Sequence, residues 1–296
     1  MPELLSICIP TYNRATYLAD LLASLERALG RAGAAAGDIR IYVSDNASSD
    51  RTPAVAAEFA ARLPLAYSRN AANIGGDRNF EHLIRTTPGT YFWLIGDDDL
   101  LVEDVLPGLV ALLRAQAPGL VVLDDLTDGP GAEEAARAKA LPARSFANYT
   151  AFVDHHRKAD VQALIAHSLI SKNVVRRTSY DPVMHGEMLA GEDVYYAFMY
   201  ALVAGLARSG ESIQVPGWPA IVVRRVGAGG GIPPWVARRL WRRYYEWLGR
   251  RYGHPELPRH GRVLYGPRHQ LRAWRKGVEA RIKRGVRALT SRGRPA

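Results

Sequence analysis

Short apolar runs alternate with longer helix-like stretches in the first half of the chain, and this alternation constrains the fold more than any other feature. The strand candidates are Ser6–Ile9, Ile39–Ser44, Leu65–Ser68, Tyr91–Ile95 and Leu120–Leu123. The helix candidates between them are Thr16–Leu29, Thr52–Ala61, Arg78–Arg85 and Glu103–Arg114. Such alternation is typical of βαβ units. We therefore predict a doubly wound α/β fold with a mostly parallel sheet flanked by helices.

The pattern weakens after the fifth strand candidate. Gly, Pro, Ala and mixed charges fill Thr127–Arg144, which predicts a loop. Beyond it we expect an amphipathic helix at Ala190–Gly205 and strands at Ile213–Val215 and Ile221–Arg225. Two basic amphipathic helices are predicted to follow, at Pro234–Arg251 and His269–Leu289.

The composition is that of a folded chain, with 48% hydrophobic and 23% charged residues. No stretch approaches the roughly 20 apolar residues that span a bilayer, and Met1–Glu3 lacks the basic start of a signal peptide. The single cysteine, Cys8, excludes an intramolecular disulfide. These features predict a cytoplasmic protein.

Polar, turn-forming residues follow four of the strand candidates. Because parallel strands end at one edge of an open α/β sheet, where ligands bind, we expect these clusters to converge. They are Pro10–Arg14, Asp45–Asp50, Asn70–Asn79 and Gly96–Asp99.

Three successive aspartates, Asp97, Asp98 and Asp99, stand directly after the apolar run Tyr91–Ile95. Their mutual repulsion costs stability unless a cation or hydrogen-bond donors offset it. Oxygen ligands without Cys or His favour Mg²⁺ or Mn²⁺, and Mg²⁺ commonly joins one or two carboxylates to substrate phosphates. The run therefore indicates a divalent metal with a diphosphate.

Each of these features also has a simpler structural interpretation. Asp97–Asp99 could begin a helix as an N-cap and an acidic first turn. Asp45 could form an Asx turn, and Asn73–Gly76 could be a tight turn with Gly at positive φ. The joint occurrence of the clusters after successive strands favours a ligand site.

Four motifs, in order, resemble family 2 glycosyltransferases of the GT-A fold. They are Ser6–Arg14, Val43–Asp50, Asn73–Asn79 and Trp93–Asp99. The resemblance implies an inverting, metal-dependent transfer of sugar from a nucleoside diphosphate sugar. The third and fourth motifs are most similar to those of bacterial abequosyltransferase-type and rhamnosyltransferase-type enzymes of surface polysaccharide synthesis.

The resemblance also implies residue roles. Asp45 would bind the base edge, Arg78 the base or phosphates, and Asp97 the ribose or sugar. Asp99, with Asp97, would hold Mn²⁺ or Mg²⁺. The residues expected to bind the nucleotide sugar are Pro10, Thr11, Asn13, Arg14, Asp45, Asn73, Arg78, Asp97 and Asp98.

An inverting transfer needs a general base that takes the proton of the acceptor hydroxyl. The resemblance places this carboxylate at the start of a helix in the second half of the chain. Asp193 fits first and Glu192 second, with Glu187 as a further candidate. Alternatively, these carboxylates only complement the positive end of a helix.

The family commonly carries a histidine after the strand that follows the base helix, and here the matching run is Val223–Gly227. Arg224 or Arg225 would then bind the departing diphosphate, because guanidinium groups bind phosphate in a bidentate manner. The Gln-x-x-Arg-Trp run of processive members is absent from the sequence, which favours transfer of a single sugar.

The last part of the chain is strongly basic. Residues 235–296 carry +15, which leaves −5 for the rest of a chain whose net charge is +10. Aromatic residues interleave with arginines, as in helices that lie on anionic membranes. Alternatively, the aromatic residues pack on the protein and the arginines are solvated. No nucleic-acid partner is expected, because the acidic strand ends would repel a polyanion.

We therefore expect a GT-A catalytic domain over residues 1–233, with a nucleotide-binding half (1–126) and an acceptor-binding half (145–233), and a basic helical extension over 234–296. The expected acceptor is a glycan or a lipid-linked acceptor, reached in the cytoplasm with peripheral contact at the inner face of the membrane. The alternatives are a nucleotidyltransferase acting on a sugar phosphate and a nucleotide-binding module without catalysis.

Overall fold

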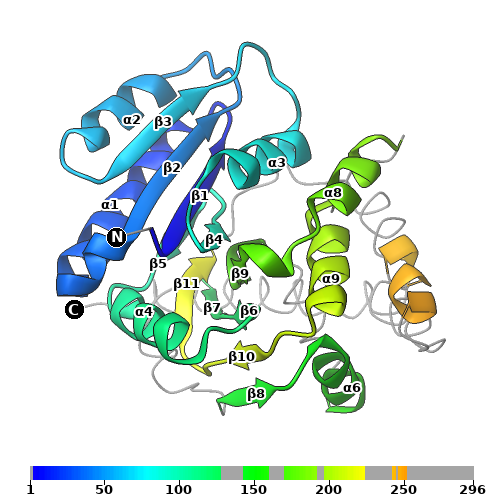
Figure 1. The fold of residues 1–296 in the computed structure, drawn as a ribbon. Coiled ribbons are helices and arrows are strands. Elements are labelled where there is room, and N and C mark those ends of the chain that lie inside the picture. Colours follow the sequence, from blue (N-terminus) through cyan, green and yellow to red (C-terminus); the bar gives the residue numbers. More distant parts are fainter. Residues whose placement is uncertain are drawn as a thin grey trace, which may run out of the picture. The chain divides into compact units, whose positions relative to one another are not determined.

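The computed structural model describes residues 3–127, 143–159, 170–191, 197–223, 242–244 and 246–251. The chain divides into two compact units, Met1–Gly229 and Gly230–Ala296. Figure 1 shows the fold as a ribbon coloured along the chain.

The first unit is built on a large sheet whose described strands follow the order β3-β2-β1-β4-β9-β6-β10-β8 (Figure 1). The strands β3, β2, β1 and β4 are all parallel. Strand β9 is antiparallel to both of its neighbours, β4 and β6, and β10 is parallel to β6 but antiparallel to β8. The bounds are β1 Leu5–Thr11, β2 Ile39–Asp45, β3 Leu65–Arg69, β4 Tyr91–Leu94, β6 Leu120–Val122, β8 Arg144–Phe146, β9 Asn173–Arg176 and β10 Ile213–Val215.

A second, smaller sheet lies beside the end of β4. It has the order β5-β11-β7, with β5 Asp99–Leu101, β11 Pro219–Val223 and β7 Asp124–Thr127. Strand β11 is antiparallel to β5 and parallel to β7, and its register places Val223 opposite Asp99. The turn Gly96–Asp99, called the acidic turn below, therefore connects β4 of the large sheet to β5 of the small one.

Helices cover the large sheet. Their bounds are α1 Ala15–Ala32, α2 Thr52–Ala60, α3 Gly76–Thr86, α4 Val105–Gln116, α6 Tyr149–Ala159, α8 Pro182–Leu189 and α9 Ala197–Ser209, with 3-10 turns η1 Gly33–Asp38, η2 Ile170–Lys172 and η3 Arg177–Ser179. Helix α1 packs on α2 and α4, whereas α3 packs on α8 and α9.

Alternate side chains of the central strands pack on opposite faces, as the pleat of a strand requires. Ile7 and Trp93 belong to the core cluster that α1 and α4 complete. Phe92, which precedes Trp93 in β4 and pairs with Ser6, instead contacts Tyr180 and Phe198 edge to face at 5.3 and 6.4 Å between ring centroids. The strands are thus buried on both sides, which explains their nearly continuous apolar sequences.

The predicted alternation of strands and helices is confirmed through α4 and β6. The expected helix at Ala190–Gly205 differs from the structure, because α8 ends at Leu189 and α9 begins at Ala197. The predicted loop Thr127–Arg144 has β7 and β8 at its two ends, and residues 128–142 lie outside the described residues.

In the second unit the described residues 242–244 and 246–251 are helical, within the predicted helix Pro234–Arg251. Tyr244 and Leu248 are buried, whereas Arg242 and Arg250 are exposed. This separation is what an amphipathic helix predicts. The predicted helix His269–Leu289 lies outside the described residues. Among the helices that the structure describes, none is long and apolar enough to cross a bilayer.

Candidate active site at the carboxyl edge of the sheet

The structure brings together the polar clusters that follow β1, β2, β3 and β4. Two backbone hydrogen bonds join the strand ends: Asn46 N donates to the Thr11 carbonyl (2.9 Å), and Asn70 N donates to the Asp45 carbonyl (2.9 Å). The predicted convergence of these clusters at one edge of the sheet is confirmed.

The first and fourth motifs meet at Asp97. Its carboxylate accepts hydrogen bonds from the Thr11 hydroxyl (2.8 Å) and from Arg14 Nη1 (3.0 Å). The same guanidinium nitrogen lies 3.1 Å from Asp98 Oδ2. Pro10 lies beside these groups in β1, paired in register with Ser44. Arg14 therefore offsets part of the charge that the sequence concentrates in this turn.

Burial and pairing act against each other at this ion pair. Burial raises the pKa of Asp97, and the Thr11 hydroxyl and the Arg14 charge only partly counter it, so the net shift is upward. For Arg14, burial lowers the pKa, but the neighbouring Asp97 and Asp98 outweigh it and the net shift is upward. Arg14 consequently stays cationic beside the turn.

Asp99 opens strand β5 instead of a helix. Its side chain is buried, and its Oδ2 accepts a 2.5 Å hydrogen bond from the hydroxyl of Ser171. The next helix, α4, begins only at Val105. The interpretation of Asp97–Asp99 as a helix N-cap is therefore wrong, because the chain returns to extended structure at the third aspartate.

The donors of this turn suit a hard divalent cation. Asp97, Asp98 and Asp99 supply carboxylate oxygens within three residues, directly after the buried strand β4. Mg²⁺ and Mn²⁺ prefer oxygen ligands, and one or two carboxylates suffice where substrate phosphates complete the coordination. In the part of the chain that the structure describes, no group of three or more His, Cys, Asp or Glu side chains is arranged to hold a metal ion by itself.

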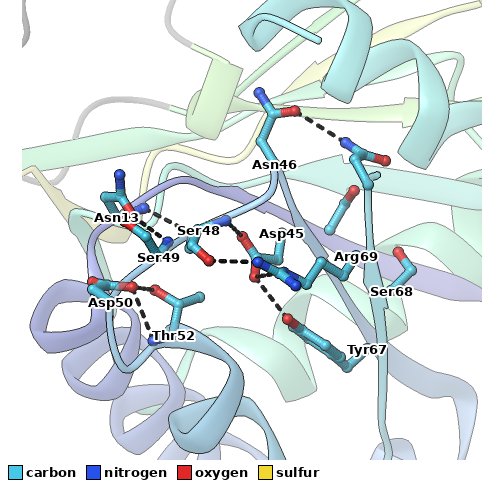
Figure 2. A network of polar contacts seen from close by, with 12 residues as sticks. Asn13, Asp45, Asn46, Ser48, Ser49, Asp50, Thr52, Tyr67, Ser68 and Arg69 are labelled. Atoms are coloured by element: carbon cyan, nitrogen blue, oxygen red, sulfur yellow. Dashed lines mark hydrogen bonds and ion pairs between the residues drawn. The ribbon is translucent and has the colours of Figure 1, made fainter. Parts of the chain in front are cut away.

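Asp45 lies at the centre of the polar network in Figure 2. Its Oδ1 accepts from the backbone N–H of Ser48 (2.8 Å), and its Oδ2 accepts from the Tyr67 hydroxyl (2.7 Å). Arg69 Nε lies 3.5 Å from Oδ2, and Arg69 Nη2 donates to the Ser48 carbonyl (2.7 Å). The bond from Ser48 forms the Asx turn that was the simpler interpretation of Asp45, and Tyr67 and Arg69 of β3 add contacts to the same carboxylate. The expected bond to a base edge stays a prediction.

Asn13 joins the first motif to the second. Its backbone N–H donates to the Ser48 hydroxyl (2.8 Å), and its Oδ1 accepts from Ser49 N (2.7 Å) (Figure 2). The backbone of Asn13 has φ +52°, a left-handed conformation that asparagine tolerates better than most residues. Asp50 accepts from Ala15 N (2.9 Å) and Thr52 N (3.0 Å), which ties the starts of α1 and α2 together.

The third motif is held by side-chain amides. Asn73 Oδ1 accepts from Asn46 Nδ2 (2.7 Å) and from Gly75 N (2.9 Å). Gly75 has φ +86°, so the predicted turn with a positive-φ glycine is present. Arg78 of α3 donates from Nη2 to the Leu189 carbonyl (3.2 Å), at the end of α8.

Of the predicted base candidates and the arginines predicted to bind the departing diphosphate, the structure describes only Glu187. Glu187 lies exposed in α8. Glu192 and Asp193, the preferred base candidates, lie outside the described residues, as do Arg224 and Arg225.

Three partners of the predicted carboxylates were not predicted from the sequence. They are Ser171, Tyr67 and Arg69, and none of them stands in a recognisable motif.

Comparison with known proteins identifies a family and a curated relative of this chain. Residues 6–180 match the family described as "Glycosyl transferase family 2". Abequosyltransferase RfbV of Salmonella typhimurium is 40% identical over 116 residues, which cover 38% of this chain and 34% of that protein. The chain thus matches about a third of the length of this relative.

Solved structures share the fold at low sequence identity. The S. aureus TarS fragment 1–349 in complex with UDP has a TM-score of 0.56 at 14% identity, over 81% of this chain and 63% of that one. The mannosyltransferase PcManGT of Pyrobaculum calidifontis, in complex with GDP-Man and Mn²⁺, has a TM-score of 0.54 at 15% identity, over 90% and 72%. These likenesses support the GT-A fold, and the family match covers more than half of the chain. The chain therefore belongs to glycosyl transferase family 2.

Proposed function

We propose that this chain transfers a single sugar from a nucleoside diphosphate sugar to a hydroxyl of a glycan or lipid-linked acceptor, in the synthesis of a cell-surface polysaccharide. The observation that carries the proposal is the meeting of Thr11, Arg14 and Asp97 across two motifs at the carboxyl edge of the sheet. A catalytically silent binding module would have no need for the acidic turn beside this cluster.

The described residues suit distinct parts of the donor. Asp45, held by the Ser48 backbone N–H and by Tyr67 and Arg69 of β3, would accept a hydrogen bond from the base. Asp97 is held from two sides, so it would present a fixed acceptor to a ribose or sugar hydroxyl. Arg14 would supply positive charge beside the diphosphate. Binding in such a prearranged site avoids the entropic cost of ordering the groups during the reaction.

A divalent cation, Mn²⁺ or Mg²⁺, would be held by Asp99 with Asp97, and when bound it would stabilise charge on the departing diphosphate. Asp193, or Glu192 in its place, would take the proton of the acceptor hydroxyl as that oxygen attacks the anomeric carbon. Attack from the face opposite the leaving group inverts the anomeric configuration.

The name of the Salmonella relative favours a deoxyhexose as the donated sugar. The two structural relatives are in complex with different nucleotides, UDP and GDP-Man, so they do not favour one nucleobase. The nucleotide is therefore best identified by experiment.

The proposal is tested by a thermal-shift screen of UDP, GDP, CDP and dTDP, each with and without Mn²⁺. One nucleotide is expected to raise Tm only when Mn²⁺ is present. At a ligand concentration of about 100 Kd, binding adds roughly 2.7 kcal/mol to the free energy of unfolding, which corresponds to a shift on the order of 5 °C.

Asp99→Ala is expected to abolish this shift. Asp104→Ala is the matched control, because Asp104 is exposed and faces Arg31 of α1 at 3.4 Å, so the shift should persist. No shift of the wild-type protein with any of the four nucleotides would contradict the proposal. Release of diphosphate from a nucleoside triphosphate and a sugar phosphate would instead indicate a nucleotidyltransferase.

A further inference from the structure

Ser171 lies behind the acidic turn, although it is 72 residues away from Asp99 in the sequence. It belongs to η2, the short turn that precedes β9, and it is 3% exposed. Its hydroxyl lies 2.9 Å from the backbone nitrogen of Gly96 and 2.5 Å from Asp99 Oδ2. The side chain therefore contacts both ends of the Gly96–Asp99 turn.

The chemistry of the groups fixes the direction of both hydrogen bonds. A backbone N–H can only donate, so the Ser171 oxygen accepts from Gly96. A hydroxyl has one proton, and an ionised carboxylate can only accept, so that proton is directed to Asp99.

Ser171 is itself fixed from behind. Its carbonyl accepts a 2.8 Å hydrogen bond from the indole N–H of Trp93, which is fully buried in β4. The next residue, Lys172, is buried and lies 2.5 Å from Asp125 of β7. The hydroxyl thus projects from a position tied to both sheets.

The turn itself leaves little room for movement. A Cβ atom on Gly96 would lie 2.8 Å from Asp98 Oδ1 and 3.3 Å from Asp99 Oδ2. The absence of a side chain at this glycine therefore lets the carboxylates lie close to the backbone of the turn. Ser171 holds Asp99 within this narrow space.

We propose that Ser171 is a positioning residue for Asp99 and sets the affinity of the site for the divalent cation that accompanies the donor diphosphate. The inference rests on the proposed function, because it assigns the cation to Asp99. Groups that hydrogen-bond a ligating carboxylate typically contribute 10- to 100-fold to metal affinity.

The test is a Mn²⁺ titration followed by electron paramagnetic resonance of the free ion, using the full chain and the nucleoside diphosphate identified by the thermal-shift screen. Ser171→Ala is expected to weaken Mn²⁺ binding by about 10- to 100-fold. Saturating Mn²⁺ should restore the nucleotide affinity of this variant, whereas a general structural defect would not be restored. Ser171→Cys, which has a weaker donor of similar size, should give an intermediate affinity.

Ser6→Ala is the matched control. Ser6 is also buried, its hydroxyl also accepts from a glycine N–H (Gly89, 2.9 Å), and it also donates to a carboxylate, that of Glu3. It lies at the opposite end of β1, so Mn²⁺ affinity should be unchanged. Equal or tighter Mn²⁺ binding by Ser171→Ala would overturn the inference alone, whereas failure of the wild-type protein to bind Mn²⁺ with any nucleotide would overturn the proposed function as well.

Discussion

The hydroxyl of Tyr67 donates to a carboxylate that solvent does not reach, since Asp45 is 0% exposed. Burial and the bond to Asp45 together raise the pKa of Tyr67, so the phenol keeps its proton at neutral pH. Hydrogen bonds to charged groups typically contribute about 1.5–3 kcal/mol. The position of Asp45 therefore depends on a residue of the neighbouring strand.

Tyr67→Phe is expected to weaken nucleotide binding by about tenfold, because Asp45, which we propose binds the base, loses a donor that fixes its position. Titration calorimetry with the nucleoside diphosphate and with ribose 5-phosphate would separate the part of the affinity that depends on the base. Only the nucleoside diphosphate should lose affinity.

The control for this variant is Tyr42→Phe. Tyr42 also donates to a carboxylate at 2.7 Å, but its partner is Glu3, at the opposite end of the sheet. Equal losses in the two variants, or a loss for ribose 5-phosphate in Tyr67→Phe, would show that Tyr67 acts on general stability and not on the base site.

At the scale of single elements, α8 contains an unusual buried residue. His185 is fully buried, and its Nδ1 lies 2.5 Å from the Tyr180 hydroxyl. Burial lowers the pKa of His185 to about 4, against the opposing effects of Glu81 and of the Asp77 backbone on α3. The imidazole is therefore neutral in the folded protein at physiological pH.

This histidine predicts a loss of stability in acid. Between pH 6.5 and about 4 the unfolded chain binds a proton that the folded chain does not, so the free energy of unfolding falls as the pH falls through this window. The difference between pH 7 and pH 4.5 is expected to be roughly 2–3 kcal/mol larger for wild type than for His185→Gln. Urea unfolding at the two pH values checks this, and identical differences would contradict it.

Elements were predictable where their sequences were apolar, rich in β-branched residues or clearly periodic. The apolar runs of β1, β2 and β4 and the periodic faces of α1 and α4 are visible in the sequence. The strands β5 and β8 are as short as β6 and β10, which were predicted, but β5 begins with Asp99 and β8 with Arg144 and Ser145, so no run of β-branched residues marks them. Helix α8 had a readable start that sequence reasoning missed: Asp181 accepts from the N–H groups of Val183 and Met184, with Pro182 at the first helical position.

The site was predictable in its motifs but not in its supports. Asp45, Asp97 and Asp99 follow strands and belong to a spacing that can be recognised. Tyr67 alternates in an ordinary edge strand, and Ser171 precedes a short strand that is inserted between two others. Their roles depend on which strands become neighbours, and a single sequence does not state this.

At the scale of the whole molecule, residues 1–234 are mildly acidic and the segment that follows is strongly basic. This contrast in charge bears on where in the cell the protein acts. The segment from residue 235 onward carries +15. In its described part, Tyr244 and Leu248 are buried while Arg242 and Arg243 are exposed. We propose that the extension brings the enzyme to an anionic membrane, where a lipid-linked acceptor would lie.

Substitution of Arg238, Arg239, Arg242 and Arg243 by Gln should then weaken binding to vesicles that contain anionic lipid. Each basic residue near such a surface contributes about 1 kcal/mol, so the loss of four of them is expected to weaken binding on the order of 1000-fold. Vesicle sedimentation measures this, with neutral phosphatidylcholine vesicles and high salt as controls. Unchanged binding would show that these arginines are solvated and do not bind the membrane.

Strand β9 runs against its neighbours, and its register pairs Val174 with Trp93. An antiparallel strand delivers its first residues to the edge where parallel strands deliver their last ones. The turn η2 ahead of β9 thereby reaches the acidic turn Gly96–Asp99 from outside the four motifs, and it can vary without any change in them. Under the role proposed for Ser171, two family members with identical motifs would differ in cation affinity through this turn, and engineering that spares the motifs would still change that affinity.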